Sequence, residues 1–357
     1  MESKAPGVVK FFGEHAVVYG NPSIAAAVNL YSNCSISHSG NVTGLIISLK
    51  NFGIEKSFSS ADIKALYSGY KKIEDSVSNR NDKAQRTRFT EEIKRYKNGS
   101  GIDKMFLPYL IIIGFFEREY GINTDSLKVE ISSEIPMQKG LASSAACSAS
   151  FAIAIDGFFN TKIEKEKLLE VARLGEIVVH ENINAGIIDT ATSFYGGLIS
   201  SANGTISRLA SDFTPDLLII DTGPKKPTSE TVGHVTKFVM ENEARAKELF
   251  SEIKECYYAG IEALKEHDVK KLGESMYKNQ ECLKELGVSS DSLDKCVSLA
   301  KEFGFYGAKL SGGGGGGIAI AIPNKDTEEA FIKKSEAMGY RVSKAHFSSE
   351  GANIVKN

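Results

Sequence analysis

The chain has 357 residues, a length that a single hydrophobic core rarely supports, so two domains with a cleft between them are expected. Hydrophobic residues make up 42% and charged residues 25% of the chain, which excludes a disordered or fibrous protein. The formal net charge of −2 gives no reason to expect nucleic acid as the main partner. Any phosphate binding must therefore be local.

Five cysteines are widely spread and form no C-x-x-C pair, which argues against a disulfide framework or a zinc site and favours a reducing compartment. The N-terminus lacks the apolar segment of a signal peptide. The longest apolar run, Met105 to Phe116, is too short to span a membrane and is interpreted as a buried helix. These features predict a cytoplasmic protein without a membrane partner.

The first predicted element is a strand over Val8 to Phe12, which is broken at Gly13 by the polar pair Glu14 and His15. Two titratable side chains just beyond the end of a strand suit the binding of a polar substrate. A second strand is predicted over Leu45 to Leu49 from its β-branched content.

Between Ala61 and Lys104 the sequence becomes polar, with many lysines and arginines among acids, serines and asparagines. We interpret this segment as an inserted, partly helical surface segment. Because exposed faces commonly carry both signs of charge, a solvated surface is the preferred interpretation of its basic residues. A lid over an anionic substrate is the alternative.

A strand, a tight loop and the start of a helix are predicted from Ile135 to Ile155. Small residues at a helix N-terminus leave backbone N–H groups free to bind phosphate oxygens, and the helix dipole adds to this attraction. Ser143 or Ser144 could add a hydroxyl ligand for Mg²⁺. Taken alone, this serine pair is as often a helix N-cap as part of a nucleotide loop. The Walker A and dinucleotide-binding glycine patterns are both missing.

Further along, Lys165 to His180 has apolar residues spaced three and four apart, which predicts an amphipathic helix. A bend rich in Gly, Asn and Ser at Ser200 to Gly204 precedes a strand-like run from Asp216 to Asp221. The predicted domains are therefore 1–204 and 205–357. Long amphipathic helices are expected over much of 229–304.

Six consecutive glycines, Gly312 to Gly317, lie between Lys309-Leu310-Ser311 and the strand-like Ile318 to Ile322. Glycines are tolerated in such numbers where the backbone needs unusual torsion angles or approaches a ligand closely. Because strand-like segments flank the run tightly, a flexible linker is the less favoured interpretation.

Three of these segments resemble, in order, the signature motifs of the GHMP kinases, and the first has the form typical of the mevalonate kinase branch. They are Gly13 to Gly20, Gly140 to Ala145 and Lys309 to Gly317. The resemblance spans nearly the whole chain outside the insert. Its intermediate matches are Glu176 with His180, Asp189 to Gly197, Asp221 to Gly223, Thr228, Asn279-Gln280 and Leu286 to Ser289.

The resemblance implies a kinase that uses ATP and Mg²⁺ to phosphorylate the 5-hydroxyl of mevalonate, or of a close relative, in isoprenoid-precursor synthesis. It also implies an α+β fold of two α/β domains with the active site between them. The N-terminal, ATP-binding domain of the family has a left-handed β-α-β crossover, and the C-terminal domain is ferredoxin-like. The sequence leaves the oligomeric state open, with a homodimer as one option.

Carried over residue by residue, the resemblance makes Asp189 the catalytic aspartate and Glu176 the Mg²⁺ carboxylate. It makes Ser144, with Ser143, the source of metal and phosphate hydroxyls, and matches Thr228 to a threonine near the catalytic centre. The implied ATP- and phosphate-binding residues are Lys139, Gly140, Leu141, Ala142, Ser143, Ser144 and Ala145. The implied substrate-binding residues are Glu14, His15, Tyr19, Gly312 and Gly313.

Two departures from the family pattern affect these assignments. Val8 stands where the family has a lysine directly after Pro-Gly, and Lys10 should point to the same face of the strand, displaced by roughly 6–7 Å. Lys10 either replaces that lysine as a catalytic residue or is an ordinary strand residue with its ammonium in solvent. Gln138 and Ala142 replace customary glycines, so the backbone there must have negative φ or tolerate strain.

The chain between Glu176 and Asp189 is also slightly longer than is usual for the family. Because these changes cluster around the acceptor pocket, a phosphorylated mevalonate such as the 3-phosphate is an alternative acceptor, with its charge met by Lys10, Lys139 or the insert. An alternative of another class is a catalytically inert GHMP-like protein that only binds a ligand, suggested by the lysine missing at Val8.

Overall fold

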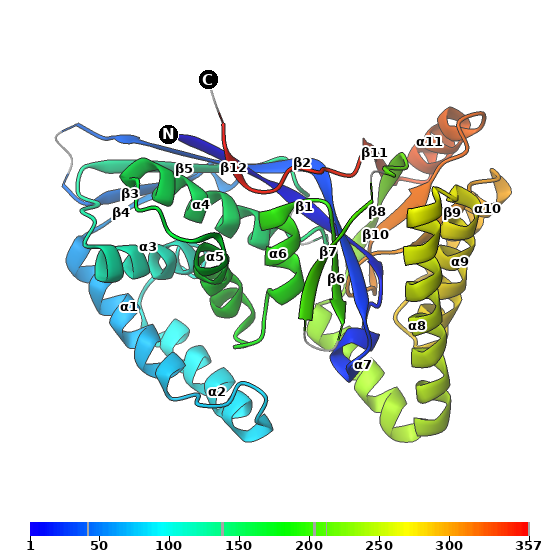
Figure 1. The fold of residues 1–357 in the computed structure, drawn as a ribbon, viewed down its shortest axis with the longest axis horizontal. Coiled ribbons are helices and arrows are strands. Elements are labelled where there is room, and N and C mark those ends of the chain that lie inside the picture. The colour runs from blue at the N-terminus through cyan, green and yellow to red at the C-terminus, as the bar shows by residue number, and fades with distance from the viewer. Residues whose placement is uncertain (41–42, 137–138, 203–204, 212, 356–357) are drawn as a thin grey trace.

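The computed structural model describes residues 1–40, 43–136, 139–202, 205–211 and 213–355. Within these ranges the strands form two sheets, and helices pack on both of them (Figure 1). The N- and C-terminal ends of the described chain lie close together, since the last strand pairs with the first. Every helix in the described ranges is too short or too polar to cross a lipid bilayer.

The larger sheet is built on two long antiparallel strands near the N-terminus. Its strands in spatial order are β12 (Asn353–Ile354), β1 (Glu2–Phe12), β2 (Ser23–His38), β5 (Leu127–Ser133), β3 (Leu45–Leu49) and β4 (Ile54–Phe58), with β6 (Leu198–Ala202) beside β2 and β7 (Thr205–Leu209) beside β6. The pairing of β3 with β5 is parallel. The strands predicted at residues 8–12 and 45–49 are confirmed.

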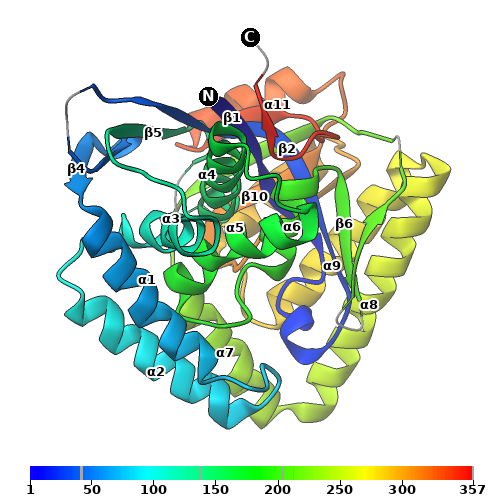
Figure 2. The same cartoon turned by 60° about the vertical axis from the view of Figure 1, so that its left-hand side comes forward.

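Two helices pack directly against this sheet, α4 (Ser143–Phe159) and α6 (Ile187–Tyr195) (Figure 2). Two further helices, α3 (Leu107–Tyr120) and α5 (Lys165–His180), pack on α4. α3 is buried from Leu107 through Glu117, as expected for a helix that has neighbours on all sides, and confirms the predicted buried helix. α5 has the predicted bounds and buries its apolar face.

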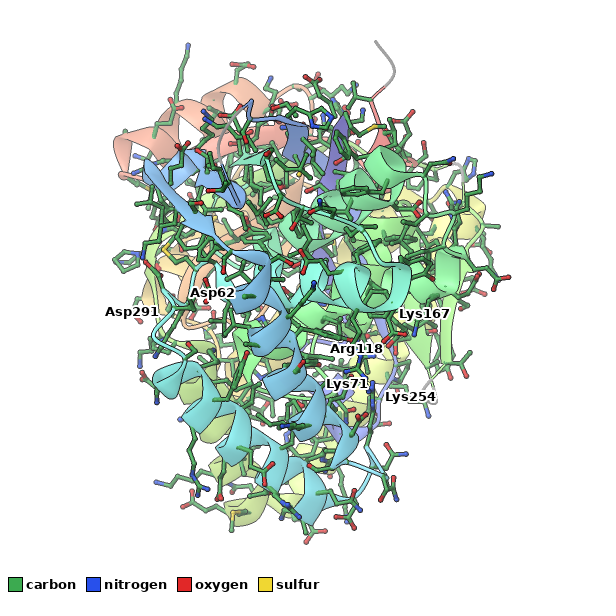
Figure 3. The ribbon with its side chains drawn as sticks, turned by 90° about the vertical axis from the view of Figure 1, so that its left-hand side faces the viewer. Asp62, Lys71, Arg118, Lys167, Lys254 and Asp291 are labelled. Atoms are coloured by element: carbon green, nitrogen blue, oxygen red, sulfur yellow. The ribbon has the colours of Figure 1, made fainter. Side chains whose placement is uncertain are left out.

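The polar insert forms α1 (Ser60–Asp75) and α2 (Lys83–Gly99), preceded by the short helix η2 (Lys50–Phe52). Figure 3 looks onto these helices, with Asp62 and Lys71 labelled on α1. The inner face of α1 packs on α3 so closely that a Cβ at Gly114 would lie 2.5 Å from the Cβ of Tyr67. The prediction of a helical segment is confirmed, but the prediction of a surface segment is wrong for the inner faces, whose residues belong to the main core. These residues are Ile63, Leu66, Tyr67, Tyr70, Phe89 and Ile93.

The second sheet has the strand order β11 (Arg341–Ala345), β8 (Leu217–Lys225), β10 (Gly316–Ile322) and β9 (Gly307–Leu310). Helices connect β8 to β9 and β10 to β11, which gives the β-α-β-β-α-β order of the predicted ferredoxin-like fold. These helices are α7 (Thr228–Glu241), α8 (Glu243–Glu266), α9 (Val269–Glu285), α10 (Asp291–Glu302) and α11 (Glu328–Ala337).

The two faces of the second sheet carry side chains that belong to two different hydrophobic cores. Ile318, Ile320 and Ile322 on β10 belong to the core that also fills the first sheet's helical layer. Ala319 and Ala321, which point to the opposite face, belong to the core beneath the C-terminal helices. The second sheet is therefore buried on both sides and fixes the two halves of the molecule against each other.

The strand pairing bears on where the domains divide. β7 follows the predicted boundary between residues 204 and 205, yet it forms a hairpin with β6 in the first sheet. β8, the next strand, belongs to the second sheet. The domain division stays a prediction, and the pairing favours placing it between Leu209 and Leu217.

The packing of α1 predicts that the insert contributes to global stability. Ile63→Ala removes a fully buried side chain and should lower the free energy of unfolding by about 2–5 kcal/mol. Lys64→Ala, at the neighbouring exposed position, should change it by less than about 0.5 kcal/mol. Urea unfolding followed by circular dichroism measures both, and equal midpoints for the two variants would mean that the insert folds independently of the core.

Candidate functional site

A cavity of about 890 Å³ is lined by residues from both halves of the chain. They come from the end of β1 and the turn after it, the start of α4, α5, α6, the polar insert and the glycine loop. Most of the predicted site residues line this cavity: Lys10, Glu14, His15, Gly140, Leu141, Ala142, Ser143, Ser144, Glu176, Asp189, Gly312 and Gly313.

The N-terminus of α4 forms one wall of the cavity. Ala142 is its N-cap residue, has φ +51° and ψ +39°, and makes no side-chain cap hydrogen bond. The N–H groups of the first turn, from Ser143 onward, therefore stay free for an anion. Of the two backbone options stated above, Ala142 adopts the strained one, since positive φ is unfavourable for a residue with a Cβ. Gln138 lies outside the described residues.

Two predicted phosphate-binding residues do not line the cavity. Ala145 is fully buried. Lys139 directs its Nζ to the second sheet, where it lies 2.9 Å from Asp221 Oδ1 and 2.8 Å from Gly223 O. The ammonium of Lys139, which was predicted to bind phosphate, therefore links the loop before α4 to β8.

Glu176 and His180 lie one turn apart on α5 and both line the cavity. Glu176 is 2% exposed, and its Oε2 lies 3.4 Å from His180 Nε2. This hydrogen bond to Glu176 raises the pKa of His180 above its usual value. The other oxygen, Glu176 Oε1, is buried and has no hydrogen-bond partner among the described residues.

An unpartnered buried carboxylate oxygen is costly unless a cation or another donor satisfies it. The Ser144 hydroxyl and Glu176 are oxygen ligands of the kind that Mg²⁺ prefers, and both lie on the same cavity. The described residues contain no group of three or more His, Cys, Asp or Glu side chains arranged to hold a metal by themselves. The site therefore fits a Mg²⁺ that would draw its remaining ligands from phosphate oxygens and water.

Lys10 and Asp189 form an ion pair on the cavity wall, with side chains 21% and 29% exposed. Asp189 lies in the first turn of α6, where a negative charge interacts favourably with the helix dipole. Lys10 lies near the end of β1. A register shift between Lys10 and Phe12 interrupts the regular pairing of β1 with β2 there. The Lys10 ammonium is therefore paired with Asp189, and its catalytic role stays a prediction.

Ser311, at the start of the glycine loop, holds the main chain of Lys10. Its Oγ accepts a hydrogen bond from the Lys10 N–H at 2.8 Å and donates one to Lys10 O at 3.2 Å. On the other side, Ser193 Oγ of α6 donates to Pro6 O of β1 at 2.6 Å. The ion pair is thus fixed by the strand, by the helix and by the second half of the chain.

The glycine run is a tight connection between β9 and β10. Gly312 and Gly314 to Gly317 all have positive φ, from +70° to +110°. A Cβ at Gly314 would lie 2.1 Å from Val288 O, so a larger residue cannot replace this glycine without movement of the backbone. His15, itself at φ +58°, brings its Nε2 to 3.0 Å from Gly313 O. These observations contradict the interpretation of the glycine run as a flexible linker. They also show that the predicted substrate-binding residues His15 and Gly313 lie next to each other.

Glu14 lines the cavity, but its carboxylate forms an ion pair with Lys309, which is fully buried at the end of β9. Burial lowers the pKa of Lys309, and the charge of Glu14 and its hydrogen bond oppose this effect. Lys309 Nζ also donates to Leu310 O at 2.7 Å, and Gln280 Oε1 accepts from Leu310 N at 2.9 Å. Glu14 is thus engaged in joining the first half of the chain to the second.

Tyr19 and Thr228 are the two predicted residues that remain. Tyr19 is absent from the cavity lining and stacks on Phe250 of α8, with ring centroids 4.7 Å apart. Thr228 is the first residue of α7, and its side chain lies outside the described residues. The two residues near it, Lys226 and Pro227, do line the cavity.

Several cavity residues were not among the predicted site residues. Lys97 and Lys104 reach the cavity from the insert, which supports an insert that covers a ligand rather than one that is only solvated. Their signal in the sequence was the basic composition of residues 61–104. Ser23 on β2 lines the cavity with a buried hydroxyl that has no partner in the described ranges, and nothing in its sequence context pointed to it.

Two family models match this chain. The model described as GHMP kinases N terminal domain matches residues 109–197, and the model described as GHMP kinases C terminal matches residues 261–340. The first match contains Ser144, Glu176 and Asp189. The second contains Lys309 and the glycine run.

Similar proteins match over nearly the full length of the chain. A mevalonate kinase of Methanocaldococcus jannaschii is 31% identical over 346 residues, covering 95% of this chain and 97% of the relative. A mevalonate kinase of Pyrococcus horikoshii is 30% identical over 343 residues, covering 93% and 91%.

Solved structures agree in fold. The crystal structure of the Methanococcus jannaschii mevalonate kinase matches with a TM-score of 0.79 and 27% identity, covering 97% of this chain and 98% of that one. The L. major mevalonate kinase in complex with R-mevalonate matches with a TM-score of 0.70 and 22% identity, covering 97% and 95%. The predicted two-domain α+β fold is thereby confirmed.

The buried pair of Glu14 and Lys309 predicts a strong coupling between its partners. Lys309→Met leaves the Glu14 charge buried and unpaired and should lower the free energy of unfolding by about 3–5 kcal/mol. Glu14→Gln combined with Lys309→Met should recover most of this loss, because no isolated charge remains.

Lys278→Met provides the control, since it breaks the exposed pair with Glu255 and should change the free energy of unfolding by less than about 1 kcal/mol. Urea unfolding of Glu14→Gln, Lys309→Met, the double variant and the wild type measures the cycle, with Lys278→Met as the control. Additive effects of the two buried substitutions would show that these charges do not depend on each other.

Proposed function

Because this chain belongs to the GHMP kinase family and is therefore an ATP-dependent kinase of small molecules, we propose that it phosphorylates the 5-hydroxyl of mevalonate in isoprenoid-precursor synthesis. The observation that carries the proposal is the ion pair of Lys10 and Asp189, which lines the same cavity as the free N-terminus of α4. The proposal is supported by relatives over nearly the full length of the chain that bear the name mevalonate kinase.

The reaction transfers one phosphoryl group. The oxygen of the acceptor hydroxyl bonds to the γ-phosphorus of ATP, the bond from that phosphorus to the bridging oxygen breaks, and ADP leaves. The hydroxyl must also lose its proton. Asp189 is the carboxylate that we assign to accept it, because it lies on the cavity wall and is held by both α6 and Lys10.

Negative charge spreads over the transferring phosphoryl group in the transition state. We assign Lys10 to stabilise this charge, as a fixed ammonium directly beside the proton acceptor. The backbone N–H groups of Ser143 and Ser144 are assigned to the phosphates of ATP, since both residues line the cavity and belong to the open first turn of α4.

We propose that Glu176 and Ser144 hold a Mg²⁺ in this cavity. When bound, the ion would neutralise charge on the phosphate oxygens of ATP. The buried and unpartnered Glu176 Oε1 supports this assignment. His180 is assigned to orient the Glu176 carboxylate through its contact with Oε2.

A phosphorylated mevalonate, such as the 3-phosphate, is the second candidate acceptor. Lys104 and Lys226 add cationic side chains to the cavity lining, which favours an acceptor with extra negative charge. A binding protein without activity is the third candidate, but the Lys10–Asp189 pair supplies the charge that Val8 lacks and speaks against it.

The location in the cytoplasm is part of this proposal, and it rests on the wide spacing of the five cysteines in the sequence. The homodimer named above remains a proposal that sedimentation can test.

Asp189→Asn tests the proposed chemistry. The purified wild type should form ADP from ATP with mevalonate in a single turnover, and the variant should do so at least ~10²-fold more slowly, because the amide cannot accept the proton. ATP binding, measured by calorimetry, should be nearly unchanged. Near-normal turnover by the variant would remove Asp189 from the mechanism, and no ADP from the wild type would remove the kinase reaction.

Lys10→Met separates three roles for that lysine. It keeps most of the apolar stem and deletes the ammonium, so kcat with mevalonate should fall roughly 10- to 10³-fold with little change in KM. A rise in KM confined to mevalonate 3-phosphate would instead make Lys10 a ligand of an acceptor phosphate. Steady-state kinetics with both acceptors measure the difference, and unchanged kcat and KM for both would refute the catalytic role.

A further inference from the structure

Helix α2 of the polar insert contacts the segment that leads from Glu176 to Asp189. Lys97, near the end of α2, has a side chain that is only 7% exposed. Its Nζ donates to Val178 O at 2.9 Å and to Val179 O at 3.3 Å, and lies 2.8 Å from Glu181 Oε1. These carbonyls belong to the last turn of α5, which has no intrahelical donors left.

The connector between α5 and α6, residues 181–186, is held from two further sides. Asn184 Nδ2 donates to Arg80 O at 3.0 Å, which is a second contact with the insert. Arg173 of α5 donates from Nη2 to Ile183 O at 2.7 Å and from Nε to Ala185 O at 2.9 Å. Hydrogen bonds of side chains to backbone carbonyls, made with the insert and with α5, therefore fix the path of the connector.

This path decides where both functional carboxylates lie. Glu176 is one turn before the end of α5, and Asp189 is in the first turn of α6, so the connector joins their two helices. Gly186, with φ +73°, packs directly on Glu176, since a Cβ at residue 186 would lie 2.5 Å from the Cβ of Glu176. A shift of the connector would move both carboxylates.

We propose that Lys97 is a positioning residue, which anchors the connector so that Glu176 and Asp189 keep their places on one cavity. This inference rests on the roles proposed above for those two carboxylates. It assigns the insert a part in the reaction, although Lys97 itself acts through the backbone of α5 and through Glu181. A buried ammonium requires such partners, because a charge removed from water without them is costly.

Lys94 provides a matched control on the same helix. Its side chain is 57% exposed, and its Nζ approaches the same Glu181 only to 3.9 Å. Lys94→Met therefore removes the same charge from α2 without removing an anchor of the connector. Lys97→Arg keeps the charge and donor groups and serves as the conservative variant.

The first measurement is amide hydrogen exchange of the nucleotide-free protein. Lys97→Met should raise exchange in peptides that cover residues 178–186, Lys97→Arg should restore much of the protection, and Lys94→Met should leave it unchanged. Peptides from α8 report whether a change is local. Because this readout needs no catalysis, it remains valid even if the wild type does not phosphorylate mevalonate.

The second measurement is steady-state kinetics on the folded variants. Lys97→Met should lower kcat by roughly 10- to 100-fold with little change in KM for ATP or acceptor, as expected for a displaced catalytic group. If Lys97→Met does not fold, Asn184→Ala loosens the same connector by removing only the contact to Arg80. It should shift both readouts in the same direction by smaller amounts.

Three results would overturn the proposal. Unchanged exchange in residues 178–186 would show that Lys97 does not anchor the connector. Raised exchange with unchanged kcat would show that the anchor is only structural. A rise in acceptor KM with unchanged exchange would make Lys97 a direct ligand of the acceptor.

Discussion

The ion pair between Lys10 and Asp189 is the interaction on which the arrangement of the site depends. Its two members come from different elements, so the pair forms only when β1 and α6 are correctly placed. Next to the register shift near the end of β1, the backbone N–H of Lys10 donates a hydrogen bond to Ser311 Oγ. Ser311 belongs to the second half of the chain. The pair is therefore a product of the whole fold rather than of one motif.

A second charged pair, formed by Glu14 and Lys309, also stabilises this arrangement. Glu14 follows β1, and Lys309 lies on β9, so their buried contact spans the two halves of the chain. Removing two charges from water is expensive, and such pairs often add little net stability. Their value here lies in geometry, because the same turn carries His15 to Gly313 and the same strand leads into Ser311.

Much of the fold was predictable from local patterns. Apolar spacing gave the bounds of α5, and β-branched content gave the strands at residues 8–12 and 45–49. The motifs also identified most of the residues that line the cavity. These predictions succeeded because each depends on residues close together in the chain.

The failures concern contacts between residues far apart in the chain. Tyr19 stacks on Phe250, and Lys139 binds Asp221. The sequence around Tyr19 does not indicate Phe250 as its partner, and the sequence around Lys139 does not indicate Asp221. The insert was misjudged for a different reason. Its abundant charges hid the apolar spacing of Ile63, Leu66 and Tyr70, which was the available sign of a packed helix face.

The central claim is that a fixed carboxylate and ammonium direct a phosphoryl group from ATP to the primary hydroxyl of mevalonate. Phosphorus nuclear magnetic resonance of the product formed from mevalonate and ATP tests this claim most directly. The account predicts a monophosphate whose phosphorus couples to the protons of a methylene group, as phosphate on the 5-oxygen requires. A product without this coupling, or reaction of a phosphorylated mevalonate alone, would contradict it.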